Sequence, residues 1–152
     1  MIISNNALKF FDKLPSDLIV RINVAWCISV EQLLTIIHNS THPIYLGCPT
    51  GRSKPPVPII PLEEVIKIAN DNYRVHYFAF SNAEDPNMVR ELRKQINTRI
   101  KLVPKIETVK GVENMMAICD AGNTDMVMLD GEDLYVNVNH DSEKYNQYTK
   151  LV

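Results

Sequence analysis

The residues of this chain that are best suited to chemistry lie between Lys101 and Leu134. Lys105 and Glu107 end an apolar run, a helical pattern follows, and a second apolar run ends in Glu132-Asp133-Leu134. Two parallel strands joined by a helix bring their carboxyl ends to the same edge of a sheet. Oxygen ligands from two strand ends, without histidine or cysteine, suit Mg²⁺ or Mn²⁺. The pattern therefore predicts a divalent metal site with Glu107 and Asp133 as ligands; solvated loop acids are the simpler alternative.

Lys105 is the candidate catalytic cation of this site. It precedes Glu107 by two residues, so we expect both side chains on one face of the strand. An ammonium group beside the metal would stabilise an enolate or a transferring phosphoryl group by preorganised charge. The alternative is a lysine that reaches solvent from a strand edge.

A second set of candidates lies outside this segment. Arg21 and Asn23 share the polar face of an otherwise apolar strand, where a buried arginine needs an anionic partner. We expect Arg21 to hold a carboxylate or phosphate during catalysis and Asn23 to contact the substrate. A structural salt bridge from Arg21 to an acid such as Glu107 is the alternative. Arg52 and Lys54 lie in a glycine-containing loop and are candidate substrate-binding cations.

Regular alternation of strand and helix patterns would position these residues. Apolar runs predict strands at Leu18–Val24, Pro43–Leu46, Val75–Ser81, Ile100–Ile106 and Asp125–Leu129. Apolar spacing and start signals predict helices after Ser29, after Pro61, after Asp85, over Gly111–Asp120 and in the polar tail from His140. The proline-rich stretch Gly47–Pro61 is a loop or an extended connection. Such alternation predicts an α/β fold with a parallel sheet and right-handed crossovers.

Composition fits one globular domain. The chain has 152 residues, of which 45% are hydrophobic and 22% charged. A net charge of −2 and dispersed Lys and Arg give no sign of a nucleic-acid partner. No apolar run approaches the roughly 18 residues of a membrane span, and the first residues lack signal-peptide features. Three cysteines without CxxC spacing are expected to be reduced thiols in a cytoplasmic protein.

Four stretches together resemble a known group of enzymes. They are Val75–Arg93, Lys105-Ile106-Glu107 with Gly111-Val112-Glu113-Asn114, Asp125–Leu134, and Arg21-Ile22-Asn23. They are similar to barrel segments of pyruvate kinase and of the HpcH/HpaI aldolase and citrate lyase β-subunit group, including a KIE…GVxN signature. The resemblance implies a TIM-type barrel that binds a small pyruvate- or phosphoenolpyruvate-like oxo acid with a divalent metal. It also implies that Ser81 and Glu132 line the substrate site.

The chain departs from this group in ways that shape the expected function. The resemblance covers about five of the eight strands of such a barrel, and Gly47 stands where these families place an acid. We therefore expect about five βα units of an incomplete TIM-type barrel, in one domain over residues 1–152, that is either a fragment or is completed in a homo-oligomer. The expected reaction is C–C lyase or aldolase chemistry, or pyruvate kinase-like transfer, through a metal-stabilised enolate. The alternative is an inactive or truncated barrel that serves as a binding module.

Overall fold

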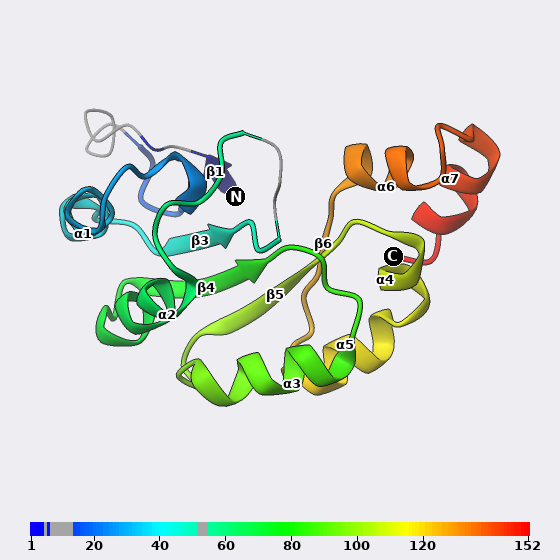
Figure 1. Ribbon diagram of the computed structural model, residues 1–152. Coiled ribbons are helices and arrows are strands. Elements are labelled where there is room, and N and C mark those ends of the chain that lie inside the picture. Colours follow the sequence, from blue (N-terminus) through cyan, green and yellow to red (C-terminus); the bar gives the residue numbers. More distant parts are fainter. Residues whose placement is uncertain (5, 7–13, 52–54) are drawn as a thin grey trace. The chain divides into compact units, whose positions relative to one another are not determined.

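The computed structural model describes residues 1–4, 6, 14–51 and 55–152, over which strands and helices alternate (Figure 1). The strands are β1 (Ile2–Ser4), β2 (Ile19–Asn23), β3 (Ile44–Cys48), β4 (Val75–Phe80), β5 (Lys101–Ile106) and β6 (Met128–Leu129). The helices are the 3-10 helix η2 (Val24–Trp26) and α1 (Val30–Asn39), α2 (Leu62–Asp71), α3 (Pro86–Gln95), α4 (Val109–Glu113), α5 (Met115–Gly122), α6 (Gly131–Asn137) and α7 (Ser142–Thr149).

The described strands form one sheet in the order β1-β2-β3-β4-β5-β6. The pairings of β1 with β2, β2 with β3 and β5 with β6 are all parallel. A parallel sheet whose strands alternate with helices confirms the predicted α/β class. Within the described residues β1 and β6 are the edges of the sheet, so these strands do not close into a TIM barrel. Strand β1 was not predicted.

The chain divides into two compact units. Unit 1 comprises Met1–Ala79 and Ile96–Lys101, and unit 2 comprises Phe80–Gln95 and Leu102–Val152. Strands β1 to β3 and helices η2, α1 and α2 belong to unit 1. Helices α3 to α7 and strand β6 belong to unit 2, and β4 and β5 contribute residues to both.

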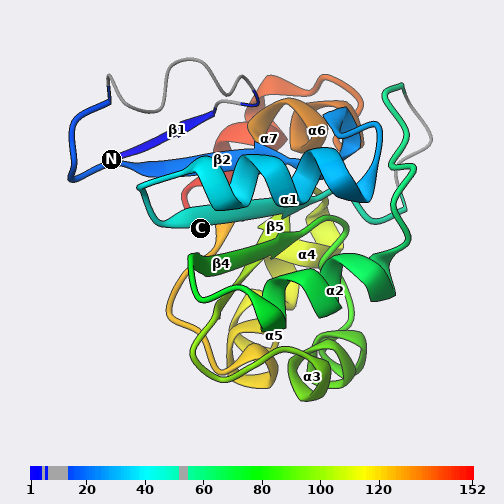
Figure 2. The same cartoon turned by 90° about the vertical axis from the view of Figure 1, so that its left-hand side faces the viewer.

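In unit 1, helix α1 begins where the sequence predicted. The Ser29 hydroxyl accepts a hydrogen bond from the Gln32 N–H at 3.2 Å, and the Gln32 side chain accepts the Ile28 N–H at 2.7 Å. The first bond satisfies a backbone donor that the first helical turn leaves free, and the second fixes the chain just before the cap. The helix passes over β2 and β3 in Figure 2, and it buries an apolar face of Leu33, Ile36 and Ile37.

Arg99 caps the carboxyl end of helix α2 in unit 1. Its guanidinium donates to the carbonyls of Ala69, Asn70 and Asn72 at 2.9, 3.0 and 2.9 Å, and to that of Val75 at 2.8 Å. The first three carbonyls belong to the end of α2, where backbone acceptors have no partner within the helix. One arginine therefore joins the end of α2 to the start of β4.

In unit 2, helices α3 and α5 lie side by side (Figure 1). The predicted single helix over Gly111–Asp120 is wrong in extent, because α4 and α5 are separate helices that meet at Asn114. The Asn114 side chain donates to the Glu84 carbonyl at 2.8 Å, which fixes the chain at this break. Helix α5 ends at Asn123, whose left-handed backbone (φ 48°) is a common helix stop.

The region after β5 and α5 corrects another prediction. Glu132, Asp133 and Leu134 do not end a strand, because β6 is only Met128–Leu129 and α6 begins at Gly131. Asp130 caps this helix, and its side chain accepts the Asp133 N–H at 3.5 Å. The strand therefore ends directly before Asp130. The tail is helical as predicted, over α7.

Candidate functional site

Lys105 is the centre of a buried polar cluster in unit 2. Only 8% of this residue is exposed, although it carries a full charge. Its ammonium donates to Oε1 of Glu107 in a close ion pair, to Oδ2 of Asp130 at 3.0 Å and to the Ser81 hydroxyl at 3.3 Å. An ammonium has three N–H donors, so these three oxygens satisfy it. The two carboxylates compensate the desolvation of the buried cation.

The second oxygen of Glu107 holds the loop that follows β4. Glu107 is 6% exposed and comes directly after β5. Its Oε2 accepts the backbone N–H of Asn82 at 2.6 Å. Asn82 has a left-handed backbone (φ 55°), a conformation that asparagine tolerates better than most residues. Glu107 therefore bridges the Lys105 side chain and the backbone beside Ser81.

Residues in and beside the KIE…GVxN pattern contact the same loop after β4. Thr108 caps α4 and donates from its hydroxyl to Oε1 of Glu84 at 2.7 Å. A Cβ atom at Gly111 would lie 2.9 Å from the Ala83 carbonyl oxygen, too close for any other residue without a shift of the backbone. With the Asn114 bond to Glu84, these contacts explain why glycine and asparagine stand at their positions in the pattern.

Three carboxylates converge beside Lys105. Glu107, Asp130 and Asp133 each offer an oxygen, and these oxygens all lie within 4.8 Å of one another. Asp130 is partly buried and Asp133 is exposed. The structure thus brings together the two predicted ligands, Glu107 and Asp133, and adds Asp130. An all-oxygen donor set of this kind fits Mg²⁺ or Mn²⁺, but two of these acids also share the Lys105 ammonium.

Sequence reasoning missed Asp130. The sequence pattern predicts a strand run that continues to Glu132-Asp133-Leu134, whereas Asp130 is the first residue after β6 and the N-cap of α6. An aspartate followed by glycine, with Asp133 three residues later and Leu134 and Val138 at helical spacing, is a pattern that indicates a helix start. That signal could have identified Asp130.

Arg21 lies in unit 1, on β2. Its Nη1 donates to the Ser4 hydroxyl at 3.4 Å, while its Nε is buried without a hydrogen-bond partner. The guanidinium lies over Gly47, where a Cβ atom would be 3.4 Å from both Nε and Nη2. No acid among the described residues forms an ion pair with Arg21, and the acid named as its alternative partner, Glu107, pairs with Lys105.

The other predicted contacts have different positions. The Asn23 side chain accepts the Ala25 N–H at 3.1 Å and caps η2, so it has a local structural role. Glu132 is an exposed residue of α6. Arg52 and Lys54 lie outside the described residues. Of the predicted substrate-binding residues, Ser81 alone is described in contact with the Lys105 cluster.

Comparison with known protein families and with curated proteins found no match to this sequence. The likeness to pyruvate kinase and the aldolase group therefore stays a resemblance of motifs. Among the described helices, none combines the length and apolar character needed to cross a bilayer. These findings define a parallel α/β protein with a buried lysine–carboxylate cluster.

Proposed function

We propose that the cluster of Lys105, Glu107, Asp130 and Asp133 is the active site of a divalent-metal-dependent enzyme acting on a pyruvate- or phosphoenolpyruvate-like oxo acid. The observation that carries the proposal is the convergence of three carboxylate oxygens next to a buried ammonium. Two of the acids follow β5 and β6 directly, which is the end of a parallel sheet where α/β proteins bind their ligands.

Each residue has a distinct task in this proposal. Glu107, Asp130 and Asp133 would hold Mg²⁺ or Mn²⁺, which when bound supplies a Lewis acid for the substrate's carboxylate and carbonyl oxygens. Lys105 is already desolvated and fixed by three oxygens, so it can neutralise a developing enolate with little reorganisation. Ser81, which contacts Lys105, would hydrogen-bond the substrate or orient the ammonium.

Within this class we favour C–C bond cleavage over phosphoryl transfer. The motif around Glu107 and Gly111 resembles both branches of the enzyme group. By this resemblance, however, Gly47–Pro61 lies where pyruvate kinase inserts its nucleotide-covering domain, and fifteen residues are too few to form that domain. An aldolase or citrate lyase-like reaction needs no nucleotide, so it fits the chain better. Pyruvate kinase-like transfer stays the alternative chemistry.

A second candidate function is a binding module without catalysis. It is favoured by the ion pairs themselves, because Lys105 neutralises Glu107 and Asp130 without any metal. It is also favoured by Gly47, a buried residue of β3 at the position where the enzymes that the chain resembles carry an acid. In this case the cluster would stabilise unit 2 and hold the loop at Asn82.

Metal binding separates the two functions. We expect wild-type protein to bind Mn²⁺, measured by calorimetry or by electron paramagnetic resonance, and to bind pyruvate, oxaloacetate or phosphoenolpyruvate only when the metal is present. Glu107→Gln should weaken Mn²⁺ binding at least about tenfold, since it removes one charged ligand. Glu91→Gln is the matched control, because Glu91 is exposed on α3 and its described ion pair is with Lys94. Absence of metal-dependent ligand binding in wild type would reject the enzyme and favour the module.

A further inference from the structure

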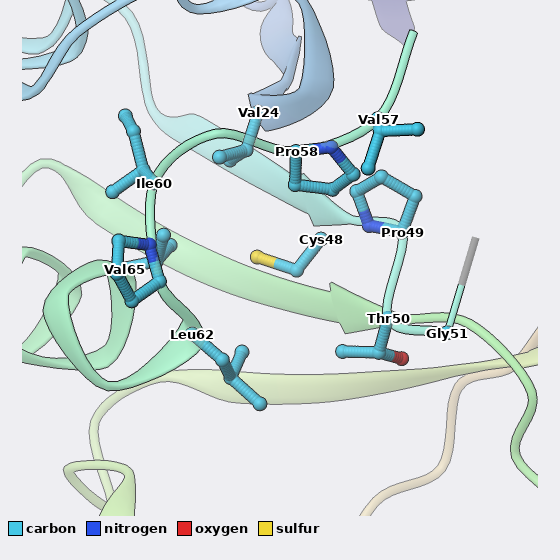
Figure 3. A pocket seen from close by; sticks show the side chains of 11 residues that line it. Val24, Cys48, Pro49, Thr50, Gly51, Val57, Pro58, Ile60, Leu62 and Val65 are labelled. Carbon is cyan, nitrogen blue, oxygen red and sulfur yellow. The ribbon is translucent and has the colours of Figure 1, made fainter. Parts of the chain in front are cut away.

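Unit 1 contains a pocket that is formed by other elements, and by other types of residue, than the lysine–carboxylate cluster. Its volume is about 370 Å³, and we name it the Cys48 pocket after the last residue of β3. Figure 3 shows Cys48 with Val24 from η2, Pro58 from the following loop, and Leu62 and Val65 from α2 around it. Small-molecule sites in proteins have volumes of roughly 300–1,000 Å³. The Cys48 pocket therefore has the size of a ligand site and lies at the carboxyl end of a parallel strand.

The described lining of the Cys48 pocket carries no charged side chain. Its polar side chains are the Thr50 hydroxyl and the Cys48 thiol. Burial raises the pKa of the Cys48 thiol far above its ordinary value, so this group is also neutral. Transferring a charged group into such surroundings without a partner is costly. The described part of the lining therefore favours an uncharged ligand, unlike the anionic oxo acids proposed for the Lys105 cluster.

Apolar side chains remain exposed on the two segments that flank the pocket. Trp26 and Ile28, at and after η2, are 61% and 74% exposed, and Val57 and Ile59 in the loop before α2 are 50% and 68% exposed. Val57 itself lines the pocket (Figure 3). Val57 is thus both half exposed to solvent and part of the pocket wall, where it is available for contact with an apolar ligand.

The pocket is also largely formed in advance. Pro49 and Pro58 contribute to its walls, and proline fixes its backbone φ. On the strand side, the wall is formed by Cys48, the last residue of the fully buried strand β3. A preformed apolar hollow gives up little conformational entropy when it is filled.

We propose that the Cys48 pocket binds a small, uncharged, predominantly apolar ligand of aromatic or aliphatic type. This binding does not depend on the proposed enzyme function, since the pocket uses other residues and takes an uncharged ligand instead of an anionic oxo acid. Indole and benzoate are suitable probes, because both are flat and aromatic while only benzoate is charged.

The test is a titration followed by methyl NMR on the full chain. Indole should cause saturable shifts at the methyl groups of Val24, Leu62 and Val65, and nuclear Overhauser contacts from indole to these methyls should place it in the pocket. Benzoate at the same concentration should leave them unchanged. Val57→Trp should fill the entrance and weaken indole binding at least about tenfold. Ile59→Trp is the matched control, because Ile59 belongs to the same loop and does not line the pocket.

Several results would overturn the proposal. One is the absence of saturable indole shifts at the pocket methyls of wild type. A second is equal binding of benzoate, which would contradict the uncharged class of ligand. A third is an equal loss in Ile59→Trp and Val57→Trp, which would mean that the loop surface and not the pocket binds indole. If Val57→Trp does not fold, the wild-type contacts from indole to Val24 and Val65 decide the question alone.

Discussion

Replacing Lys105 with methionine would leave Glu107 and Asp130 side by side without their cation. Glu107 has only 6% of its side chain exposed, so its charge would stay desolvated and uncompensated. Breaking a buried ion pair in this way costs about 3 kcal/mol. We expect Lys105→Met to lower the free energy of unfolding by that order, measured by urea denaturation. Lys94→Met is the control: its pair with Glu91 is exposed on both sides and should contribute almost nothing.

The same variant tests whether the acids can share a metal. Without Lys105, a divalent cation at Glu107, Asp130 and Asp133 would neutralise the repelling charges. Mg²⁺ should therefore raise the melting temperature of Lys105→Met by more than it raises that of wild type, because a ligand that binds only the folded state stabilises it. Equal Mg²⁺ effects on Lys105→Met and wild type would contradict a shared cation site.

At the scale of residues, the sequence supported some expectations and missed others for physical reasons. Lys105 and Glu107 are two residues apart, and a strand places such residues on one face; the two side chains do pair. Asp130 was missed because its role depends on where a strand of two residues ends. The partner of Arg21 could not be predicted, because Ser4 belongs to a strand that carries no strong pattern.

Helix ends give the clearest predictions at the scale of elements. Ser29→Ala should lower the free energy of unfolding by about 1 kcal/mol, since the Gln32 N–H would lose its acceptor. Ser29→Asp should restore most of the loss, because aspartate is an equally good N-cap. Urea denaturation of the three proteins measures both effects. A loss in Ser29→Asp as large as in Ser29→Ala would contradict a capping role.

Arg99 gives a second test, at the opposite end of a helix. Lysine is a point charge and cannot reach the four carbonyls that the guanidinium fork contacts. We expect Arg99→Lys to lose about 1–2 kcal/mol of stability in urea denaturation, because it leaves acceptors at the end of α2 without partners. Arg90→Lys is the matched control, since the Arg90 side chain is exposed and its described bond is to Asn87 alone. Equal losses in the two variants would contradict the proposed role of Arg99.

The elements themselves were predictable where local signals were strong. As expected, Pro61 directly precedes α2 and Pro86 is the first residue of α3, because proline suits the start of a helix. The end of β6 is predicted wrongly because Asp130 and Gly131, which begin α6, follow the short strand without a break. The helix start is marked by the Asp130 cap and by the spacing of Leu134 and Val138, which covers little more than one turn.

At the scale of the whole molecule, the parallel α/β class followed from regular strand–helix alternation. The number of strands could not be predicted, because β1 is three residues long and carries no alternating pattern. Nor could the apolar pocket be predicted. Its walls come from η2, the end of β3 and the start of α2, which are brought together only by the fold. The lysine–carboxylate cluster was easier to predict, because Lys105 and Glu107 are only two residues apart at the end of one strand.

Buried thiols should make the stability of the whole protein depend on alkaline pH. Burial raises the pKa of the Cys27 thiol to about 11, against an ordinary value of about 8.5. Between these values the unfolded chain releases a proton that the folded chain keeps. Stability is therefore full below about pH 8.5 and falls as the pH rises toward 11, by up to about 1.4 kcal/mol per pH unit for one such group.

Cys27→Ala removes one of these groups and should reduce that slope. Burial also raises the pKa of the Cys48 thiol, and that of Tyr45 to about 12, so part of the decline should persist in the variant. Urea denaturation at intervals from pH 7 to about 10.5 measures the two slopes. Met116→Ala is the control, because Met116 is 71% exposed and carries no titratable group, so its replacement should leave the slope unchanged. Parallel curves for wild type and Cys27→Ala would mean that Cys27 ionises alike in the folded and unfolded chains, contrary to its burial.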